Sequence, residues 1–168
     1  MLEWLGVSAG DRLLVAGAAG AVGGLALQLA RVRGVREDAL VSREAHLDFT
    51  REWGAEFATT DPAALAHRHY DAVFDTFGAF VTEAVADGGR YAYIATQVGP
   101  VPDLIARRVL TTINQVREDG VGLRELTTYV YQGAVSLRVG STFGIHDIQA
   151  AHRRFGQGGL NGKVTVTF

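Results

Sequence analysis

Cysteine is absent from this sequence, and lysine and proline are scarce. The 168 residues include no cysteine, three prolines and a single lysine, Lys163. A chain without cysteine forms no disulfide, binds no metal through a thiolate and has no thiol nucleophile. Neither sign of charge dominates, because 16 basic residues against 18 acidic ones give a net charge of -2, and no overall positive field attracts nucleic acid. We therefore expect small-molecule chemistry and no nucleic-acid partner.

The N-terminal segment lacks the features of an export signal. Glu3 stands where a signal has a basic residue, and Asp11 and Arg12 interrupt the chain before an apolar segment is complete. Residues 13–30 carry no charge and are long enough to imitate a membrane span, but four glycines split this run and its periodicity changes within it. We therefore expect a cytoplasmic protein with no membrane partner.

Short apolar runs alternate with segments of helical periodicity along the chain. Strands are predicted at residues 12–17, 39–42, 57–59, 70–75 and 90–95, with helices at 21–32, 45–53 and 80–86. The last third predicts extended segments at 110–116, 135–139 and 164–168, and helices at 123–131 and 145–155. This alternation predicts an α/β fold with a Rossmann-type, doubly wound parallel sheet. We expect one domain over residues 1–168, with 1–11 as a lead-in and 163–168 as the terminal strand.

The most informative motif is a glycine-rich turn between the first predicted strand and helix, Gly17-Ala18-Ala19-Gly20-Ala21-Val22-Gly23. Such a turn binds the pyrophosphate of a dinucleotide, because the backbone can approach closely at Gly20 and the helix can pack on the strand at Gly23. The free amides of residues 21–23 then face the phosphates. Ala18 replaces the first glycine of the usual pattern, and a turn that serves only packing is the alternative. A Walker A loop is excluded, because no Lys-Ser or Lys-Thr follows.

The residues after the second predicted strand bear on the choice of dinucleotide. An acidic residue about 20 positions past the glycine turn is typical of NAD-binding domains, but Ser42 and Arg43 occupy that place. A hydroxyl and a guanidinium suit the 2′-phosphate of NADP(H). We therefore expect NADPH rather than NADH. Two alternatives remain: Arg43 is a solvated charge at a helix start, or Glu44 turns inward in its place.

Two further strand ends belong to the predicted site, because ligands of open α/β sheets bind beyond the carboxyl ends of the strands. Phe77 and Gly78 follow one strand, and we expect them to border the adenosine. Ala95 and Thr96 follow the next strand, and we expect them to lie under the nicotinamide. Asp75, the last residue of its strand, is either part of the site or an acid that caps the turn after it.

Other chemistries have less support in the sequence. His67 and His69 share one side of an extended segment, but no third ligand follows, so we expect no metal site. No tyrosine is followed four residues later by lysine, which is the acid pair of short-chain reductases, and no serine lies in a Gly-x-Ser-x-Gly motif. A methyltransferase that binds S-adenosylmethionine has a similar glycine turn but normally an acid after the second strand, where Ser42 and Arg43 stand.

Several segments, taken in order, resemble the cofactor domain of medium-chain dehydrogenases/reductases, in the quinone oxidoreductase branch. They are residues 6–15 (GVSAGDRLLV), the glycine turn 17–23, 28–30 (QLA), 53–56 (WGAE), 70–78 (YDAVFDTFG), 88–90 (GGR) and 162–164 (GKV). The resemblance covers almost the whole chain. It implies NADPH-dependent hydride transfer to a quinone, an enone or an enoyl thioester.

The resemblance also assigns residues and exposes a gap. It implies that residues 20–22 hold the pyrophosphate and that Ser42 and Arg43 hold the 2′-phosphate. Thr60 stands where relatives often present a tyrosine to that phosphate. Members of this family carry a GroES-like catalytic domain that this sequence lacks, so no catalytic residue is assigned and the chain looks like a cofactor-binding fragment. A non-catalytic NADP(H)-binding module is the alternative.

Self-association is the last expectation that the resemblance supports. Family dimers often join through an edge strand, for which residues 135–142 are the expected segment. The final strand, residues 164–168, is expected to lack its usual partner, and an unpaired strand edge invites association.

Overall fold

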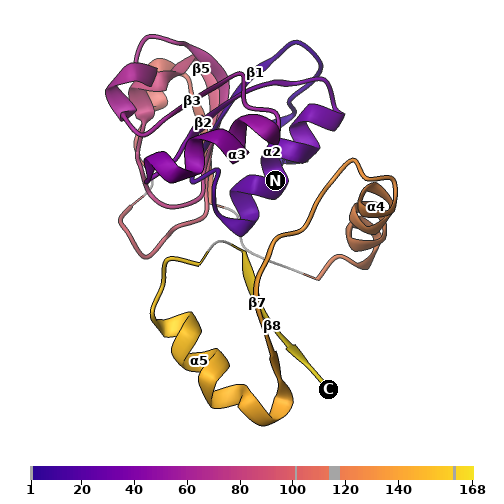
Figure 1. Ribbon diagram of the computed structural model, residues 1–168. Coiled ribbons are helices and arrows are strands. Elements are labelled where there is room, and N and C mark those ends of the chain that lie inside the picture. The colour runs from indigo at the N-terminus through magenta and orange to yellow at the C-terminus, as the bar shows by residue number, and fades with distance from the viewer. Residues whose placement is uncertain (1, 101, 114–117, 161) are drawn as a thin grey trace. The chain divides into compact units, whose positions relative to one another are not determined.

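Six parallel strands form one sheet, in the order β3-β2-β1-β4-β5-β6 (Figure 1). They are β1 (Arg12–Ala16), β2 (Arg36–Leu40), β3 (Phe57–Thr59), β4 (Tyr70–Asp75), β5 (Val85–Tyr93) and β6 (Leu110–Ile113). The order reverses between β1 and β4, because the chain builds outward from β1 to β3 and then returns to the other side of β1. This is the strand order of doubly wound dinucleotide-binding folds, and the predicted Rossmann-type sheet is confirmed.

This computed structural model describes residues 2–100, 102–113, 118–160 and 162–168. The chain divides into two compact units, residues 1–135 and 136–168. The first unit contains the six-stranded sheet, the helices α1 (Leu2–Leu5), α2 (Ala21–Val32), α3 (Leu47–Glu52) and α4 (Gly120–Tyr131), and the short 3-10 helices η1 (Glu44–His46), η2 (Pro62–Leu65), η3 (Thr82–Ala84) and η4 (Ile105–Arg107). The interpretation of residues 1–168 as one cofactor-binding domain stays a prediction.

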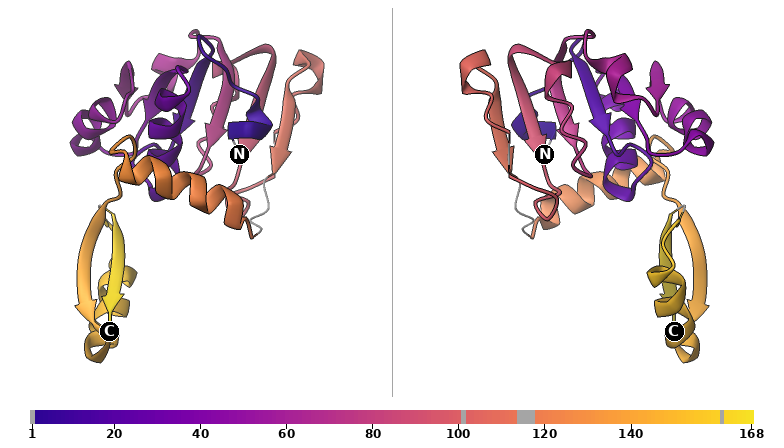
Figure 2. Two further views of the ribbon diagram at one scale, coloured as in Figure 1. Left: turned by 90° about the vertical axis from the view of Figure 1, so that its right-hand side faces the viewer. Right: turned by 90° about the vertical axis from the view of Figure 1, so that its left-hand side faces the viewer.

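Both faces of the sheet are covered, as the apolar strands of a parallel sheet require (Figure 2). Successive side chains of β1 point to opposite faces. Leu13 and Val15 pack in a cluster with residues of α2, and Trp53 after α3 joins that cluster. Leu14 lies on the other face in a cluster with Leu65 of η2 and with residues around η3 and η4. Helices therefore cover one face, and 3-10 turns cover much of the other.

The strand β2 begins three residues earlier than predicted. The prediction started late because the first residues of the strand are charged, and such residues indicate a turn. The structure satisfies these charges at the amino end of the sheet. Arg36 pairs with Glu56 at 2.9 Å between Nη2 and Oε2, and the buried Asp38 accepts from the Nε of Arg68 at 3.0 Å. The charged residues at the start of β2 therefore masked its strand pattern in the sequence, and ion pairs with distant residues stabilise the strand.

The predicted helix at residues 80–86 is wrong. Only the 3-10 turn η3 forms there, and β5 already begins at Val85. The Gly88-Gly89 pair lies inside β5 at a register shift between the pairs Tyr70–Val85 and Ala72–Arg90. Gly88 has a φ of 78°, and a Cβ at Gly89 would lie 2.8–2.9 Å from neighbouring atoms. The two glycines thus permit a bulge within a longer strand.

The second unit consists of β7 (Val139–Gly144), η5 (Ile145–Asp147), α5 (Ile148–Gly156) and β8 (Lys163–Thr167). The two strands pair in parallel, so the final strand has a partner within this unit. The extended segment predicted at 135–139 is displaced, because β7 starts only at Val139. The helix predicted at 145–155 is confirmed. Of the strand predicted at 110–116, β6 covers 110–113, and residues 114–116 lie outside the described part of the chain.

Candidate functional site

The carboxyl ends of the central strands are joined by backbone hydrogen bonds into one edge. The Gly17 amide donates to the Leu40 carbonyl at 2.9 Å, the Thr76 amide donates to the Ala16 carbonyl at 2.9 Å, and the Ile94 amide donates to the Asp75 carbonyl at 3.1 Å. The turn after β1 is therefore held between the ends of β2 and β4. This is the point where the strand order reverses, and ligands of doubly wound sheets bind in the crevice there.

The glycine turn joins β1 directly to α2, as its sequence predicts, although Ala18 stands at one of the usual glycine positions. Its positive φ, 81°, falls on Gly17, while Ala18 has no exposed surface and belongs to the core. Ala18 is thus compatible with the turn although it replaces a glycine of the usual pattern. A Cβ at Gly23 would overlap the carbonyl oxygen of Gly17, so Gly23 is required for the helix to pack on the turn. Gly20 has only one atom, the same carbonyl oxygen at 3.2 Å, near its Cβ position.

The N-terminus of α2 is open and carries no acidic residue. Gly20 is the N-cap residue and offers no side-chain cap, and the first turn contains no Asp or Glu. The Gly24 amide donates to the Gly20 carbonyl at 2.8 Å, where the helical bonding pattern begins. Among the described residues, no hydrogen bond uses the amides of residues 21–23, the first turn of α2, as donors; such amides lack intrahelical partners by geometry. These amides and the helix dipole make the site fit a diphosphate.

Ser42 and Arg43 follow β2 at the same edge of the sheet, and both are exposed. Within the described part of the chain, the Arg43 guanidinium has no ion pair or hydrogen bond. Glu44 is also exposed and begins η1, so the alternative that it turns toward the ligand in place of Arg43 stays open. A free guanidinium beside a hydroxyl fits a phosphate monoester.

The remaining predicted residues lie at the ends of β3, β4 and β5. Thr60 follows β3 and is half-buried, Phe77 is 42% exposed, Ala95 is buried and Thr96 is exposed. The structure brings Phe77 against the glycine turn, because a Cβ at Gly17 would lie 2.9 Å from the Phe77 ring. No hydrogen bond among the described residues joins the side chains of Thr60 or Thr96 to the other predicted residues.

Sequence reasoning missed two side chains that shape this edge. The Thr76 hydroxyl donates to the Ala16 carbonyl at 2.8 Å and also lies 3.3 Å from the Gly17 carbonyl. The Tyr91 hydroxyl donates to Asp75 at 2.8 Å, and amides of the following loop also donate to this carboxylate, so Asp75 caps the turn after β4. The Asp-Thr-x-Gly pattern at the strand end was a signal for the capping, but the partner on β5 depends on strand pairing.

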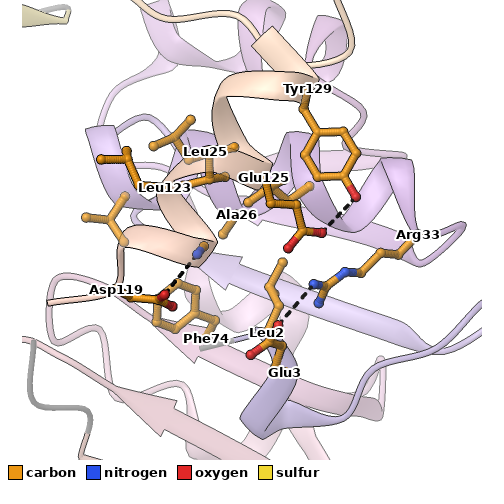
Figure 3. A pocket seen from close by; sticks show the side chains of 14 residues that line it. Leu2, Glu3, Leu25, Ala26, Arg33, Phe74, Asp119, Leu123, Glu125 and Tyr129 are labelled. Carbon is orange, nitrogen blue, oxygen red and sulfur yellow. Dashed lines mark hydrogen bonds and ion pairs between the residues drawn. The ribbon is translucent and has the colours of Figure 1, made fainter. Parts of the chain in front are cut away.

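A separate hollow of about 520 Å³ lies between α1, α2, α4 and β4 (Figure 3). Its lining is mainly apolar, with Leu25 and Leu123 facing it from α2 and α4. Among the residues predicted for the cofactor site, Val22 is the one that lines it. This hollow is therefore not the predicted site.

Metal-ligating clusters and membrane-spanning helices are both missing from the described ranges. No group of three or more His, Asp or Glu residues there lies close enough to hold a metal ion, and neither His67 nor His69 belongs to such a group. No helix in the described part of the chain is long and apolar enough to cross a membrane.

The strand order and the open helix N-terminus of residues 1–135 are those of the dinucleotide-binding class of folds. Residues 47–166 match the zinc-binding dehydrogenase family. The chain belongs to this family of oxidoreductases, and the resemblance to medium-chain dehydrogenases/reductases, whose members bind nicotinamide dinucleotides, is confirmed. The described residues offer no ligand set for the zinc in the family's name.

Individual relatives agree with this assignment. The chain is 28% identical to prostaglandin reductase 1 of Oryctolagus cuniculus over 97% of its own length and 55% of that protein. It is similar to the quinone oxidoreductase from Thermus thermophilus, solved also with NADPH, at 29% identity and a TM-score of 0.81, over 99% of this chain and 61% of that one. An NAD-dependent alcohol dehydrogenase matches at 25% identity and a TM-score of 0.86, over 99% and 54%. The chain thus spans little more than half the length of these relatives.

Proposed function

We propose that this chain is the cofactor-binding half of an NADPH-dependent reductase that transfers hydride to a quinone, an enone or an enoyl thioester. The bound nicotinamide supplies the hydride. The residues of this chain hold the dinucleotide: the amides opening α2 bind the diphosphate, and the loops after β4 and β5 border the adenosine and the nicotinamide. The similarity to a quinone oxidoreductase that was solved with NADPH supports the proposal.

The free guanidinium of Arg43 is the observation that carries the choice of NADPH over NADH. The 2′-phosphate is the only group that distinguishes the two coenzymes, and a fork of donors next to a hydroxyl favours a dianion there. NAD-binding domains usually have an acid in this place, which would repel the phosphate. The similarity to an NAD-dependent enzyme makes a direct test necessary.

The test is Arg43→Ala with both coenzymes. We expect NADPH binding to weaken by about 1.5–3 kcal/mol, on the order of tenfold to a hundredfold, because a charge-assisted interaction is lost. NADH binding stays nearly unchanged. Arg36→Ala is the matched control, because it removes the same charge from the opposite end of β2, and we expect it to leave both affinities unchanged. Equal losses for the two coenzymes in Arg43→Ala would contradict the assignment.

We also propose that catalysis needs a GroES-like partner half. Residues 136–168 contain only a two-stranded parallel sheet and one α-helix among the residues described there, and so small a sheet needs further packing for stability. Exposed apolar side chains in this unit, among them Val139 and Phe155, offer a surface for that packing. Measuring quinone and enone reduction with and without an added GroES-like half distinguishes a catalytic half from a module that only binds NADP(H).

Self-association through an edge strand is part of the same proposal. Of the expected segment 135–142, only the residues from Val139 onward are in a strand, β7. The contact would therefore be restricted to the outer edge of β7. Sedimentation equilibrium measures this self-association in the wild type and in a variant with Thr142→Pro in β7.

A further inference from the structure

Asp75, the last residue of β4, is a fully buried carboxylate, and no Arg, Lys or His of the described chain forms an ion pair with it. Backbone amides and one hydroxyl meet its charge instead. Its Oδ1 accepts from the amides of Phe77 at 3.2 Å, Gly78 at 2.8 Å and Ala79 at 3.2 Å. Its Oδ2 accepts from the Phe80 amide at 2.9 Å and the Tyr91 hydroxyl at 2.8 Å. One side chain thus organises the whole loop after β4.

This loop has a backbone shape that it would not adopt alone. Gly78 has a φ of 83°, and Phe80 has a φ of 51°, in the left-handed region that a bulky side chain rarely occupies. The bond from the Phe80 amide to Oδ2 holds that residue in place. Four amides point inward at Asp75, so they are not available to an outside anion, whereas the amides at the start of α2 have no such internal acceptor among the described residues.

The loop in turn contacts the loops after β1 and β5. Thr76 donates its hydroxyl to the Ala16 carbonyl at 2.8 Å, beside the glycine turn. A Cβ at Gly78 would lie 2.8 Å from Val98, so the loop after β5 packs directly on it. The Phe80 ring lies 5.3 Å from the Tyr93 ring. The shape imposed by Asp75 is therefore transmitted to both neighbouring loops of the site.

We propose that Asp75 and Tyr91 form a positioning pair for the dinucleotide site, which sets the loop after β4 against the glycine turn before any ligand binds. This role rests on the proposed function. A preordered loop lowers the conformational cost of binding either coenzyme. Burial and the Asp75 carboxylate raise the pKa of Tyr91, so its hydroxyl remains a donor to Oδ2.

A second buried pair in the same sheet provides a matched control. Asp38 is 4% exposed, and its Oδ2 accepts from the Tyr70 hydroxyl at 2.6 Å. Tyr70 is the first residue of β4, so this pair lies toward the opposite end of the strand from Asp75. Tyr91→Phe and Tyr70→Phe therefore remove the same type of bond, one near the site and one remote from it.

The experiment compares thermal midpoints and dissociation constants for NADPH and NADH in the wild type, Tyr91→Phe and Tyr70→Phe. We expect both variants to lose similar thermal stability. Only Tyr91→Phe weakens binding, by about fivefold and equally for both coenzymes, because the loop does not contact the 2′-phosphate. Asp75→Asn and Asp38→Asn form a second pair of variants. We expect Asp75→Asn to lose more coenzyme affinity than Tyr91→Phe does, and Asp38→Asn to keep the wild-type affinity. If Asp75→Asn does not fold, Tyr91→Phe carries the test, since it keeps the carboxylate and its four amide donors.

The outcomes are distinguishable. Unchanged coenzyme affinity in Tyr91→Phe overturns the positioning role while the proposed function stands. Equal losses of coenzyme affinity in Tyr91→Phe and Tyr70→Phe do the same. A loss confined to NADPH also overturns it, because that pattern belongs to the 2′-phosphate. A wild type that binds neither coenzyme overturns the proposed function and this role with it.

Discussion

Glu37 shows how a single buried side chain links this fold to pH. It lies on β2 and is 2% exposed, and its Oε1 has no hydrogen-bond partner among the described residues. Burial raises the pKa of Glu37 to about 8, although Arg31 opposes the shift, and Glu56 and Asp38 add to it. Because the unfolded chain ionises near the ordinary value, 4.5, the folded state binds the extra proton between these two values.

We expect the free energy of unfolding to fall as pH rises from about 4.5 to about 8, by at most about 1.4 kcal/mol per pH unit from this group. Below 4.5 both states are protonated, and above 8 both are ionised, so the contribution is constant outside the window. Urea unfolding at about pH 5, 6.5 and 8 measures the slope. Glu37→Gln removes the titration and should flatten the curve; a variant that keeps the wild-type slope would show that Glu37 is not its source.

In the strand-turn-helix element β1-turn-α2, two glycines only three residues apart differ in the space around them. A Cβ at Gly20 meets one atom at 3.2 Å, whereas a Cβ at Gly23 overlaps the Gly17 backbone. A methyl group at Gly20 therefore requires only a small shift away from one carbonyl oxygen, whereas at Gly23 it overlaps the backbone of the turn. Only the first position is open toward the crevice where the diphosphate is proposed to bind.

We expect Gly20→Ala to change the thermal midpoint little and to weaken NADPH and NADH binding about tenfold, because its methyl group occupies the space proposed for the diphosphate. Gly23→Ala should lower the stability by about 1–3 kcal/mol, because overpacking forces the helix away from the turn. Differential scanning fluorimetry and coenzyme titration separate the two effects. Normal coenzyme affinity in Gly20→Ala would argue against a diphosphate at this turn.

Elements whose signals are local were predictable, and elements that depend on distant partners were not. The β1-turn-α2 unit follows from an apolar run, glycines and helical periodicity. The helix expected at residues 80–86 is absent, because Asp75 and Tyr91 impose a loop on the chain before it. The early start of β2 was hidden by Arg36 and Asp38, whose partners lie 20 and 30 residues further along the chain.

At the scale of the whole molecule, every residue predicted for the cofactor site lies in residues 1–135, the unit with the six-stranded sheet. The meeting of these residues at the carboxyl edge of the sheet was predictable, because strand ends and the glycine turn fix it. The Asp75 network and the free state of Arg43 required the structure. The chain also spans only 55% of a curated relative, and we propose that the contacts that select the substrate lie outside this chain.

The most direct test of the account is isothermal titration calorimetry of the intact chain with NADPH and NADH. We predict saturable binding of one dinucleotide per chain, with NADPH bound about tenfold or more tightly than NADH. Absence of saturable heat with both coenzymes would contradict the central claim that the open amides of α2 hold a diphosphate.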